Sequence, residues 1–363
     1  MVCRAGSKYF GADKANASWE NWSGDVTFSP ETLRVPKHAP PSGGAGTGGP
    51  AAPPYITDPS AGLASLVEAV ADATDKKQEL HVIGNGWAFE DCAKSDKVMV
   101  SLANLNLELH DVLDPRNGAL TDDTLAMQND PFRKKRLGHF EAGIRIADLC
   151  EALDKQNLAM PTLGGSNGQS LAGAISTSTH GGDWNQPPFP DVVRAVHLVT
   201  EGGRELWIEP ARNPVTKADS DSAALRAVLP CKDIEIVRDD LIFDAVRVAC
   251  GRFGVIYSLV LEVRRQFRVV QVVTTPTAAS VVQALREGQS TGHLFTPLFR
   301  LLARDPAPGG FSDAQGVPYF VEITFNSQRP SDVWVRRRWE TVTDGSTDTS
   351  FEPAGSQFEA PKS

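Results

Sequence analysis

Apolar positions recur with two different periods along the chain, and together they predict a protein that mixes helices and strands. Between residues 58 and 75, apolar side chains recur at helical spacing behind Pro59, so we expect an amphipathic helix there. The apolar run Leu80–Ile83 that follows predicts a buried strand, and it leads directly into the loop GNGWAFED at residues 84–91. A helix, a strand and a glycine-rich loop in this order are typical of an α/β unit that binds nucleotides.

Similar patterns predict further elements downstream. A strand that turns into an amphipathic helix covers residues 139–161. A helix, a glycine-containing turn and a strand cover residues 243–267, and apolar and polar residues alternate in that strand from Ile256 to Glu262. Gly202 and Gly203 join two of the predicted strands, which indicates a hairpin. The other predicted strands lie at residues 19–36, 97–105, 191–203 and 204–210.

Two low-complexity stretches interrupt these elements. Residues 40–54 contain only Pro, Gly, Ala, Ser and Thr, so we expect a flexible insertion within residues 37–55. The tail from residue 344 to residue 363 is polar and is expected to be disordered. Between residue 269 and this tail the pattern predicts only a strand, a helix near residues 279–288 and a strand at residues 317–325. This second region is therefore small.

Composition argues against several classes of function. The chain has 363 residues and a formal net charge of −9, and its basic runs are short, so no nucleic-acid partner is expected. The five cysteines are odd in number and show no CxxC spacing, so neither a disulfide framework nor a zinc site is predicted. No apolar stretch is long enough to span a bilayer, and the N-terminus lacks an apolar signal segment. We therefore expect a cytoplasmic protein.

The most unusual stretch is PTLGGSNGQSLAGAISTSTHGGD at residues 161–183, in which most side chains are small. Small residues allow a backbone to lie against an extended ligand, and they offer N–H and hydroxyl donors to it. They also allow a helix to pack tightly on a sheet. The stretch alone does not decide between these interpretations.

The loop at residues 84–91 is ambiguous in the same way. It lacks the third glycine of the dinucleotide-binding fingerprint, since Phe89 occupies that position, and it lacks the GK[ST] end of a P-loop. Two glycines after a strand therefore indicate either a backbone cradle for a phosphate or a simple turn. Trp87 is the unexpected residue, because an indole is large for a loop that is suited to close approach.

Five sequence blocks resemble one known family in their order along the chain. They are NWSGD at 21–25, VIGNGWAFEDCA at 82–93, EAGIRIADLCEALDKQNLAMPTLGGSNGQSLAGAISTSTHGGD at 141–183, VVRAVHLVTEGG at 192–203 and CGRFGVIYSLVLEV at 250–263. They resemble the FAD-binding domain of the vanillyl-alcohol-oxidase (PCMH-type) flavoproteins, and most of all the branch of alditol oxidases and aldonolactone (gulonolactone, arabinonolactone) oxidases. The resemblance implies an α+β fold, in which a PCMH-type FAD-binding domain of two α/β subdomains occupies residues 1–268. A partial α+β substrate (cap) domain would follow at residues 269–363.

The resemblance also implies which residues bind the cofactor, FAD. Main-chain N–H groups of the loop after the predicted strand would wrap the FAD pyrophosphate, which then needs no basic side chain. The second block would run beside the ribityl chain and the flavin ring, and the turn before the last strand would border the adenine or the flavin. No metal is expected, and no catalytic residue is assigned. The implied cofactor-binding residues are Val82, Ile83, Gly84, Asn85, Gly86, Trp87, Ala88, Gly165, Ser170, Gly173, Thr177, Ser178, Thr179, His180, Gly254, Val255 and Ile256.

Trp87 departs from the pattern of the family. Many relatives carry at this position a histidine that bonds covalently to the flavin, and an indole cannot form that bond. The cysteine of the other known attachment is missing from PTLGGSNGQS, so the resemblance implies a noncovalent FAD. An indole that simply packs on the loop is compatible with this expectation. His180 is assigned to cofactor binding rather than to proton abstraction.

The resemblance implies an FAD-dependent oxidoreductase that acts on the CH–OH group of a polyol, a sugar lactone or a similar alcohol. Hydride would pass to flavin N5, and O2 or another acceptor would reoxidise the flavin. The alternative is a catalytically incomplete flavin-binding module or fragment that needs a missing cap domain or a partner, because the resemblance fades after residue 268. The oligomeric state is not predicted. Candidates for substrate contact, for which solvated surface charge is the simpler interpretation, are Arg300, Arg304, Glu322, Arg336, Arg337 and Arg338.

Overall fold

The computed structural model describes residues 2–4, 14–15, 18–21, 23–38, 60–131, 135–183, 185–218, 222–229, 233–292, 296–302 and 318–341. Apart from residues 37–38, the predicted insertion and the predicted tail lie outside the described residues. The described residues form two compact units: the first comprises residues up to His180 together with Pro188–Arg265, and the second comprises Gly181–Pro187 and residues from Gln266 onwards. This division lies close to residue 268, and the roles assigned to the two domains stay a prediction.

The N-terminal part of the first unit contains two small sheets with a shared core. One sheet has the order β2 (Lys14–Ala15), β5 (Thr32–Arg34), β7 (Val98–Ser101), β6 (Leu80–Ile83), and the last three strands are parallel. The other has the order β1 (Val2–Arg4), β3 (Ser18–Glu20), β4 (Thr27–Phe28). Trp19, Phe28, Leu33, Ile83 and Met99 are buried together. The predicted strand before the GNGW loop is therefore confirmed, and its last residue, Ile83, is fixed in a core.

The larger sheet of this unit has the order β13 (Glu235–Arg238), β12 (Arg204–Glu209), β11 (Val193–Thr200), β14 (Val255–Arg265), β9 (Arg136–Glu141), β8 (Glu108–Leu109), and β10 (Leu158–Ala159) pairs with the end of β14. The predicted hairpin is confirmed, since Thr200 of β11 lies opposite Arg204 of β12. Gly202 and Gly203 close it with φ angles of 74° and 75°, a backbone conformation that favours glycine.

The strand β14 differs from its predicted pattern. Its alternating residues suggested one buried face, but all residues from Val255 to Leu261 are buried. The reason is its central position between β11 and β9, with an apolar core on each side: Leu259 belongs to one core and Val260 to the other. A strand that is covered on both faces has no solvent side to which a polar pattern could correspond.

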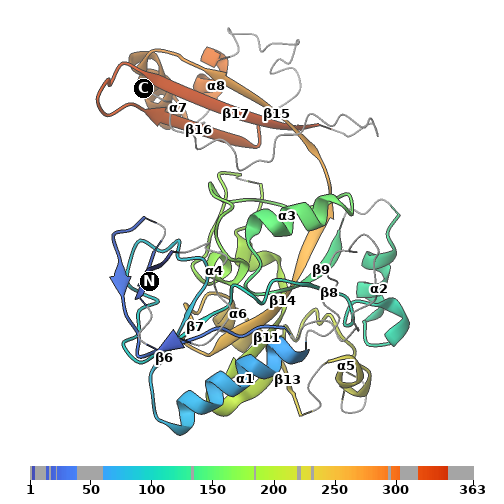
Figure 1. Ribbon diagram of the computed structural model, residues 1–363. Coiled ribbons are helices and arrows are strands. Elements are labelled where there is room, and N and C mark those ends of the chain that lie inside the picture. The colour runs from blue at the N-terminus through green and yellow to red at the C-terminus, as the bar shows by residue number, and fades with distance from the viewer. Residues whose placement is uncertain are drawn as a thin grey trace, which may run out of the picture. The chain divides into compact units, whose positions relative to one another are not determined.

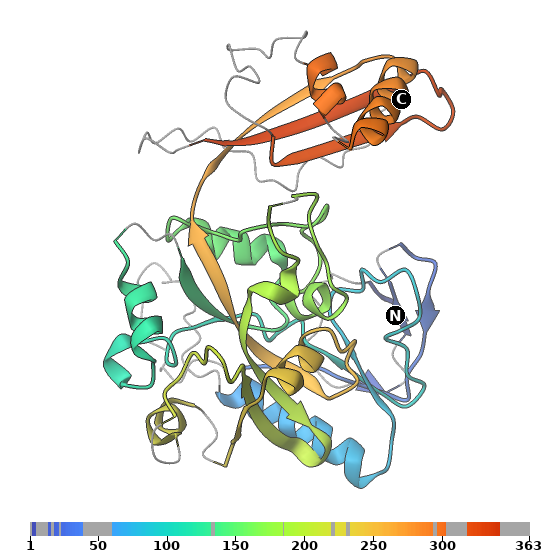
Figure 2. The same ribbon diagram turned by 180° about the vertical axis from the view of Figure 1, so that it is seen from behind.

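Helices cover both faces of the larger sheet. One core contains apolar residues of α1 (Ser60–Asp75), α3 (Ile146–Asp154), α4 (Leu171–Ser176) and α6 (Asp240–Arg247), and the other contains residues of α2 (Asp122–Asn129) and α5 (Ala223–Val228). Short 3-10 turns are η1 (Pro115–Asn117), η2 (Phe189–Val192) and η3 (Glu201–Gly203). The helix α1 lies alongside β11 in Figure 1, and the reverse view in Figure 2 agrees. No helix in the described part of the chain is long and apolar enough to cross a membrane.

A buried histidine in the larger sheet links the stability of the first unit to pH. His139 is 4% exposed, and its Nε2 atom lies 2.8 Å from Ser258 Oγ. Burial, with smaller effects from His197 and His110, lowers the pKa of His139 from 6.5 to about 3. Below pH 6.5 the unfolded chain therefore binds a proton that the folded chain does not bind. The stabilisation is complete above pH 6.5 and decreases as the pH falls from 6.5 towards 3.

We expect the free energy of unfolding to decrease by about 1.4 kcal/mol per pH unit through this residue between pH 6 and pH 4. Urea unfolding of the wild type and of His139→Asn at a series of pH values measures this slope. The asparagine variant cannot titrate, so its slope should be smaller by about that amount. Equal slopes for the two proteins would contradict the assignment.

The second unit is a three-stranded antiparallel sheet with the order β15 (Arg268–Thr274), β17 (Val333–Thr341), β16 (Phe320–Phe325). Val333 and Val335 of β17 pack with Val281 of α7 (Ala278–Thr291) and Leu298 of α8 (Thr296–Leu302), so both helices cover one face. The predicted strands β15 and β16 and the predicted helix α7 are confirmed. The sequence did not lead us to predict β17 or α8.

The basic run Arg336–Arg338 is part of β17, so its side chains alternate between the two faces of the sheet. Arg337 lies on the helix-covered face and is only 2% exposed, with its guanidinium 5.3 Å from the centre of the Trp339 ring. The interpretation of Arg337 as solvated surface charge is therefore wrong. Arg300 is exposed on α8, as that interpretation requires, and Arg304 lies outside the described residues.

The other face of this sheet carries the remaining candidates for substrate contact. Arg336 pairs with Glu322 at 2.9 Å, and Arg338 donates to Gln271 Oε1 at 2.9 Å. Both arginines therefore have partners on neighbouring strands. A role for them in substrate contact stays a prediction.

Candidate cofactor site

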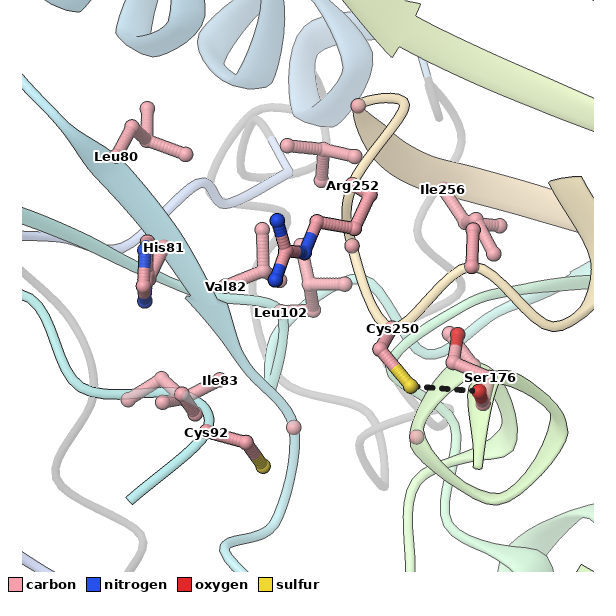
Figure 3. A pocket seen from close by; sticks show the side chains of 18 of the residues that line it. Leu80, His81, Val82, Ile83, Cys92, Leu102, Ser176, Cys250, Arg252 and Ile256 are labelled. Atoms are coloured by element: carbon pink, nitrogen blue, oxygen red, sulfur yellow. Dashed lines mark hydrogen bonds between the residues drawn. The ribbon is translucent and has the colours of Figure 1, made fainter. Parts of the chain in front are cut away.

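A cavity of about 1040 Å³ lies in the first unit beside the loop that follows β6. Its walls come from β6 and residues 84–90, from the segment between Gln169 and Thr177, and from the segment between Val246 and Ile256, together with the end of β11. Figure 3 shows side chains of these segments around it. Small-molecule pockets span about 300–1,000 Å³, so this cavity can take a ligand at the large end of that range.

Most residues that the family resemblance implicates in cofactor binding line this single cavity. The four that do not line it are Gly165, Ser178, Thr179 and His180. Of these four, Gly165 and His180 are exposed. The structure thus brings the GNGW loop, the α4 segment and the turn before β14 together, and the assignment of these residues to FAD stays a prediction. Those that line the cavity are Val82, Ile83, Gly84, Asn85, Gly86, Trp87, Ala88, Ser170, Gly173, Thr177, Gly254, Val255 and Ile256.

Close packing between two loops explains part of the small-residue stretch. A Cβ atom on Gly84 would lie 1.9 Å from Ser170 Oγ, and one on Gly168 would lie 2.2 Å from Trp87 Cζ2. Asn85 Nδ2 donates to the Gly168 carbonyl at 3.0 Å, so the two loops are also tied by a hydrogen bond. Tight packing therefore applies to part of this stretch, although it is packing of two loops rather than of a helix on a sheet, and contact with a ligand stays a prediction. The indole of Trp87 packs against the backbone of Gly168.

The main-chain N–H groups of Gly84, Asn85 and Gly86 donate no hydrogen bond to any described residue. Gly86 has a φ of 68°, which lies in the left-handed region that favours glycine. Successive N–H groups in such a turn form a concave set of donors that binds anions. These residues therefore fit the pyrophosphate of FAD, and they do so without a basic side chain in the loop itself.

Substitution of Gly168 by alanine tests the contact with Trp87. The added methyl group would overlap the indole, so we expect Gly168→Ala to lower the free energy of unfolding by about 1–3 kcal/mol. Urea unfolding of the double variant Trp87→Leu/Gly168→Ala measures the coupling. Its loss in free energy of unfolding should be smaller than the sum of the losses of the two single variants, because leucine leaves room for the added methyl group. If the losses in free energy of unfolding of the two single variants add up to that of the double variant, Gly168 and Trp87 are not in energetically significant contact.

Charged side chains of both signs surround the cavity. Glu79 is engaged by His81, whose Nε2 lies 2.9 Å from the Glu79 carboxylate. The anionic and cationic groups are therefore mixed, and the local arrangement rather than the sum of charges decides where an anion binds. The charged residues that line the cavity, besides His81, are Lys77, Glu79, Glu90, Glu201 and Arg252.

Two cysteines, Cys92 and Cys250, line the cavity. Partial burial and the neighbouring Cys250 thiol raise the pKa of Cys92, so its thiol is protonated at neutral pH and is a poor nucleophile. In the segments that the structure describes, no group of His, Cys, Asp and Glu side chains could hold a metal ion.

Arg252 is the residue at this site that sequence reasoning missed. It lies in the turn CGRFG, between the end of α6 and β14, and its side chain lines the cavity. The signal in the sequence was a single arginine between two glycines, directly before the strand that the resemblance placed near the cofactor.

Comparison with known proteins gives consistent matches. Residues 62–209 match the family described as FAD binding domain. The chain is 29% identical over 154 residues to D-arabinono-1,4-lactone oxidase of Yarrowia lipolytica, which is 42% of this chain and 26% of that protein. It is 30% identical over 106 residues to alditol oxidase of a Streptomyces species, which is 29% of this chain and 26% of that protein. It is 25% identical over 218 residues to L-gulonolactone oxidase of Bos taurus, which is 60% of this chain and 39% of that protein.

These matches confirm the resemblance to the aldonolactone and alditol oxidase branch. The chain covers at most 39% of the length of these three relatives. Among solved structures, cholesterol oxidase from B. sterolicum is similar with a TM-score of 0.55 and 12% identity, over 94% of this chain and 51% of that one. At this identity the likeness concerns the fold alone, and it confirms the predicted PCMH-type α+β fold class.

Proposed function

We propose that the protein is an FAD-dependent oxidoreductase acting on CH–OH groups, because residues 62–209 match the family described as FAD binding domain. The substrate class that we propose is a polyol, a sugar lactone or a similar small alcohol. The chemistry that FAD supplies when bound is acceptance of a hydride from the substrate carbon at flavin N5. The observation that carries the proposal is the single cavity in which the GNGW loop, the α4 segment and the turn before β14 meet.

The residues of the cavity suit distinct parts of such a cofactor. Gly84, Asn85 and Gly86 would hold the pyrophosphate through main-chain N–H groups that have no partner among the described residues. Ser170 and Thr177 carry hydroxyl groups that would bond to the polar chain of the cofactor. The apolar side chains next to the turn before β14 would exclude water from one side of it.

Anaerobic reduction tests the proposed activity. The purified chain would first be titrated with FAD and then mixed without oxygen with a panel of alditols, aldonolactones and secondary alcohols. We expect bleaching of the flavin absorbance by at least one member of the panel, and free FAD with the same compounds is the control. An acceptor, O2 or another oxidant, would then be identified by reoxidation.

Two outcomes would contradict the proposal, and they differ in meaning. A chain that binds FAD but is bleached by no member of the panel would be the catalytically incomplete flavin-binding module, the alternative to the proposed activity. A chain that gains no flavin absorbance when FAD is added would contradict both the oxidoreductase and the flavin-binding module, because both require bound FAD.

The attachment of the flavin gives a separate prediction. Because Trp87 occupies the position where relatives carry an attaching histidine, we expect acid precipitation of the FAD-loaded protein to leave all flavin in the supernatant. Absorbance of the two fractions measures the partition, with a known covalent flavoprotein as the control. Flavin that stays with the precipitated protein would contradict the prediction.

A further inference from the structure

The turn between α6 and β14 has an unusual backbone. Cys250, Gly251 and Gly254 have φ angles of 47°, 78° and 141°, and all three values are positive. A positive φ is uncommon for a residue other than glycine, so Cys250 is held in its conformation by the surrounding structure. The chain therefore adopts one defined path through this turn.

Contacts fix the turn at both ends. A Cβ atom on Gly254 would lie 2.5 Å from the Val199 carbonyl oxygen, so the turn is pressed directly onto β11. At the other end, Cys250 Sγ donates to the Ser176 carbonyl at 3.2 Å, which ties the turn to α4 (Figure 3). Arg252 lies between these two anchors, and its own N–H group donates to the Ala249 carbonyl at 3.0 Å.

The Arg252 side chain extends from this turn into the cavity, toward β6 (Figure 3). It makes no ion pair or hydrogen bond with a described residue. Other arginines of the same unit are engaged, for example Arg204 with Glu235 at 2.8 Å and Arg212 with Asp240 at 2.9 Å. All N–H donors of the Arg252 guanidinium are therefore available to a ligand in the cavity.

The loop from Gly84 to Gly86 also lines this cavity, and its N–H groups have no partner among the described residues. A planar guanidinium binds a phosphate through two parallel hydrogen bonds, and successive main-chain N–H groups bind the same anion from another side. Both kinds of donor line one cavity that also carries the carboxylates of Glu90 and Glu201. A cation in the cavity, where Lys77 and Arg252 both line the wall, offsets the repulsion between these carboxylates and an anionic ligand.

We propose that Arg252 forms an ion pair with the pyrophosphate of the bound FAD and is the cation that the GNGW loop lacks. This inference rests on the proposed function, because it assigns one residue to the cofactor that the function requires. Arg252 is a binding residue in this proposal and takes no part in the chemistry at the flavin ring.

The test measures FAD affinity by fluorescence titration of the full chain and of three variants. Arg252→Gln removes the charge, and we expect it to weaken FAD binding by about 10- to 100-fold. Arg252→Lys keeps the charge without the paired donors and should lie between the wild type and Arg252→Gln. Arg116→Gln is the matched control, because it changes the net charge equally at a side chain that is 90% exposed and does not line the cavity.

Two further readouts separate an ion pair from a structural effect. Salt screens exposed charge pairs, so FAD affinity should fall more steeply with ionic strength for the wild type than for Arg252→Gln. ADP-ribose contains the same pyrophosphate without the flavin ring, so its own dissociation constant should also rise in the variant, by about the same 10- to 100-fold factor.

Several results would overturn the inference. FAD affinity of Arg252→Gln within twofold of the wild type would do so, as would equal weakening in Arg252→Gln and Arg252→Lys together with a lower melting temperature of the unliganded proteins. In either case wild-type FAD binding would persist, and the proposed function would stand. If the wild type itself does not bind FAD, the proposed function fails first and the inference fails with it.

Discussion

Replacement of Glu209 by alanine is expected to lower the free energy of unfolding by about 3–5 kcal/mol, because it leaves a charged partner without compensation. Glu209 ends β12 and is 0% exposed. Its carboxylate pairs with Arg238 Nε at 2.8 Å and accepts hydrogen bonds from the N–H groups of Val215 and Thr216 at 2.9 and 3.1 Å. The Thr216 hydroxyl donates a further bond at 2.6 Å. Without Glu209 the largely buried Arg238 guanidinium and three donors lose their acceptor.

Urea unfolding of Glu209→Ala measures this loss, with Glu235→Ala as the matched control. Glu235 also carries an ion pair at the same edge of the sheet, with Arg204 at 2.8 Å, but the side chains are 56% and 66% exposed. Exposed pairs contribute about 0–1 kcal/mol, so the control should stay close to the wild type. Similar stabilities for the two variants would mean that Glu209 does not hold this region together.

Replacement of Gly254 by alanine should reduce both stability and FAD binding. The new Cβ atom would lie 2.5 Å from the Val199 carbonyl oxygen and 3.1 Å from Thr200 Cα, and φ at Gly254 is 141°. Strain of this kind and overpacking together should cost about 2–4 kcal/mol. Because the turn that Gly254 anchors forms one wall of the cavity, we expect FAD affinity to fall by more than about tenfold, which corresponds to 1.4 kcal/mol.

The control for this substitution is Gly118→Ala. Gly118 also has a positive φ, 76°, but nothing lies within 4 Å of its Cβ position and it does not line the cavity. Gly118→Ala should lower the free energy of unfolding by about 1–2 kcal/mol, because of the left-handed backbone conformation alone, and it should leave FAD affinity unchanged. Thermal unfolding and fluorescence titration of both variants check the prediction, and it is wrong if Gly254→Ala binds FAD as well as Gly118→Ala does.

The elements that could be predicted from the sequence are those whose pattern is local. Each of three such elements is indicated by a pattern within about twenty residues. Helical spacing indicates the helix α1, an apolar run indicates the strand β6, and paired glycines indicate the β11–β12 hairpin. Strand β17 was missed because its basic run resembles exposed charge. Arg337 is buried there only because helices from elsewhere in the chain cover that face.

The site was predictable only in part, for a related reason. The spacing of the GNGW loop, the α4 segment and the turn before β14 contains no information on whether they meet. The family resemblance supplied that expectation. The arginine between two glycines was a signal for Arg252, but the direction of its side chain depends on how Gly254 rests on β11 and how Cys250 is tied to Ser176. Nothing within the turn itself encodes these contacts.

The position of β14 determines when the first unit can be completed during synthesis. Among the strands of the larger sheet β14 is the last along the chain, yet it lies between β11 and β9. Before it emerges, β8 with β9 and β11 with β12 and β13 are two separate groups of strands that share no hydrogen bonds in the final sheet. Pairings between residues far apart in the chain form late and slowly. The cavity takes its last wall from Val255 and Ile256 of this strand, so the site that we propose for FAD is incomplete in a growing chain until the two groups of strands have been joined.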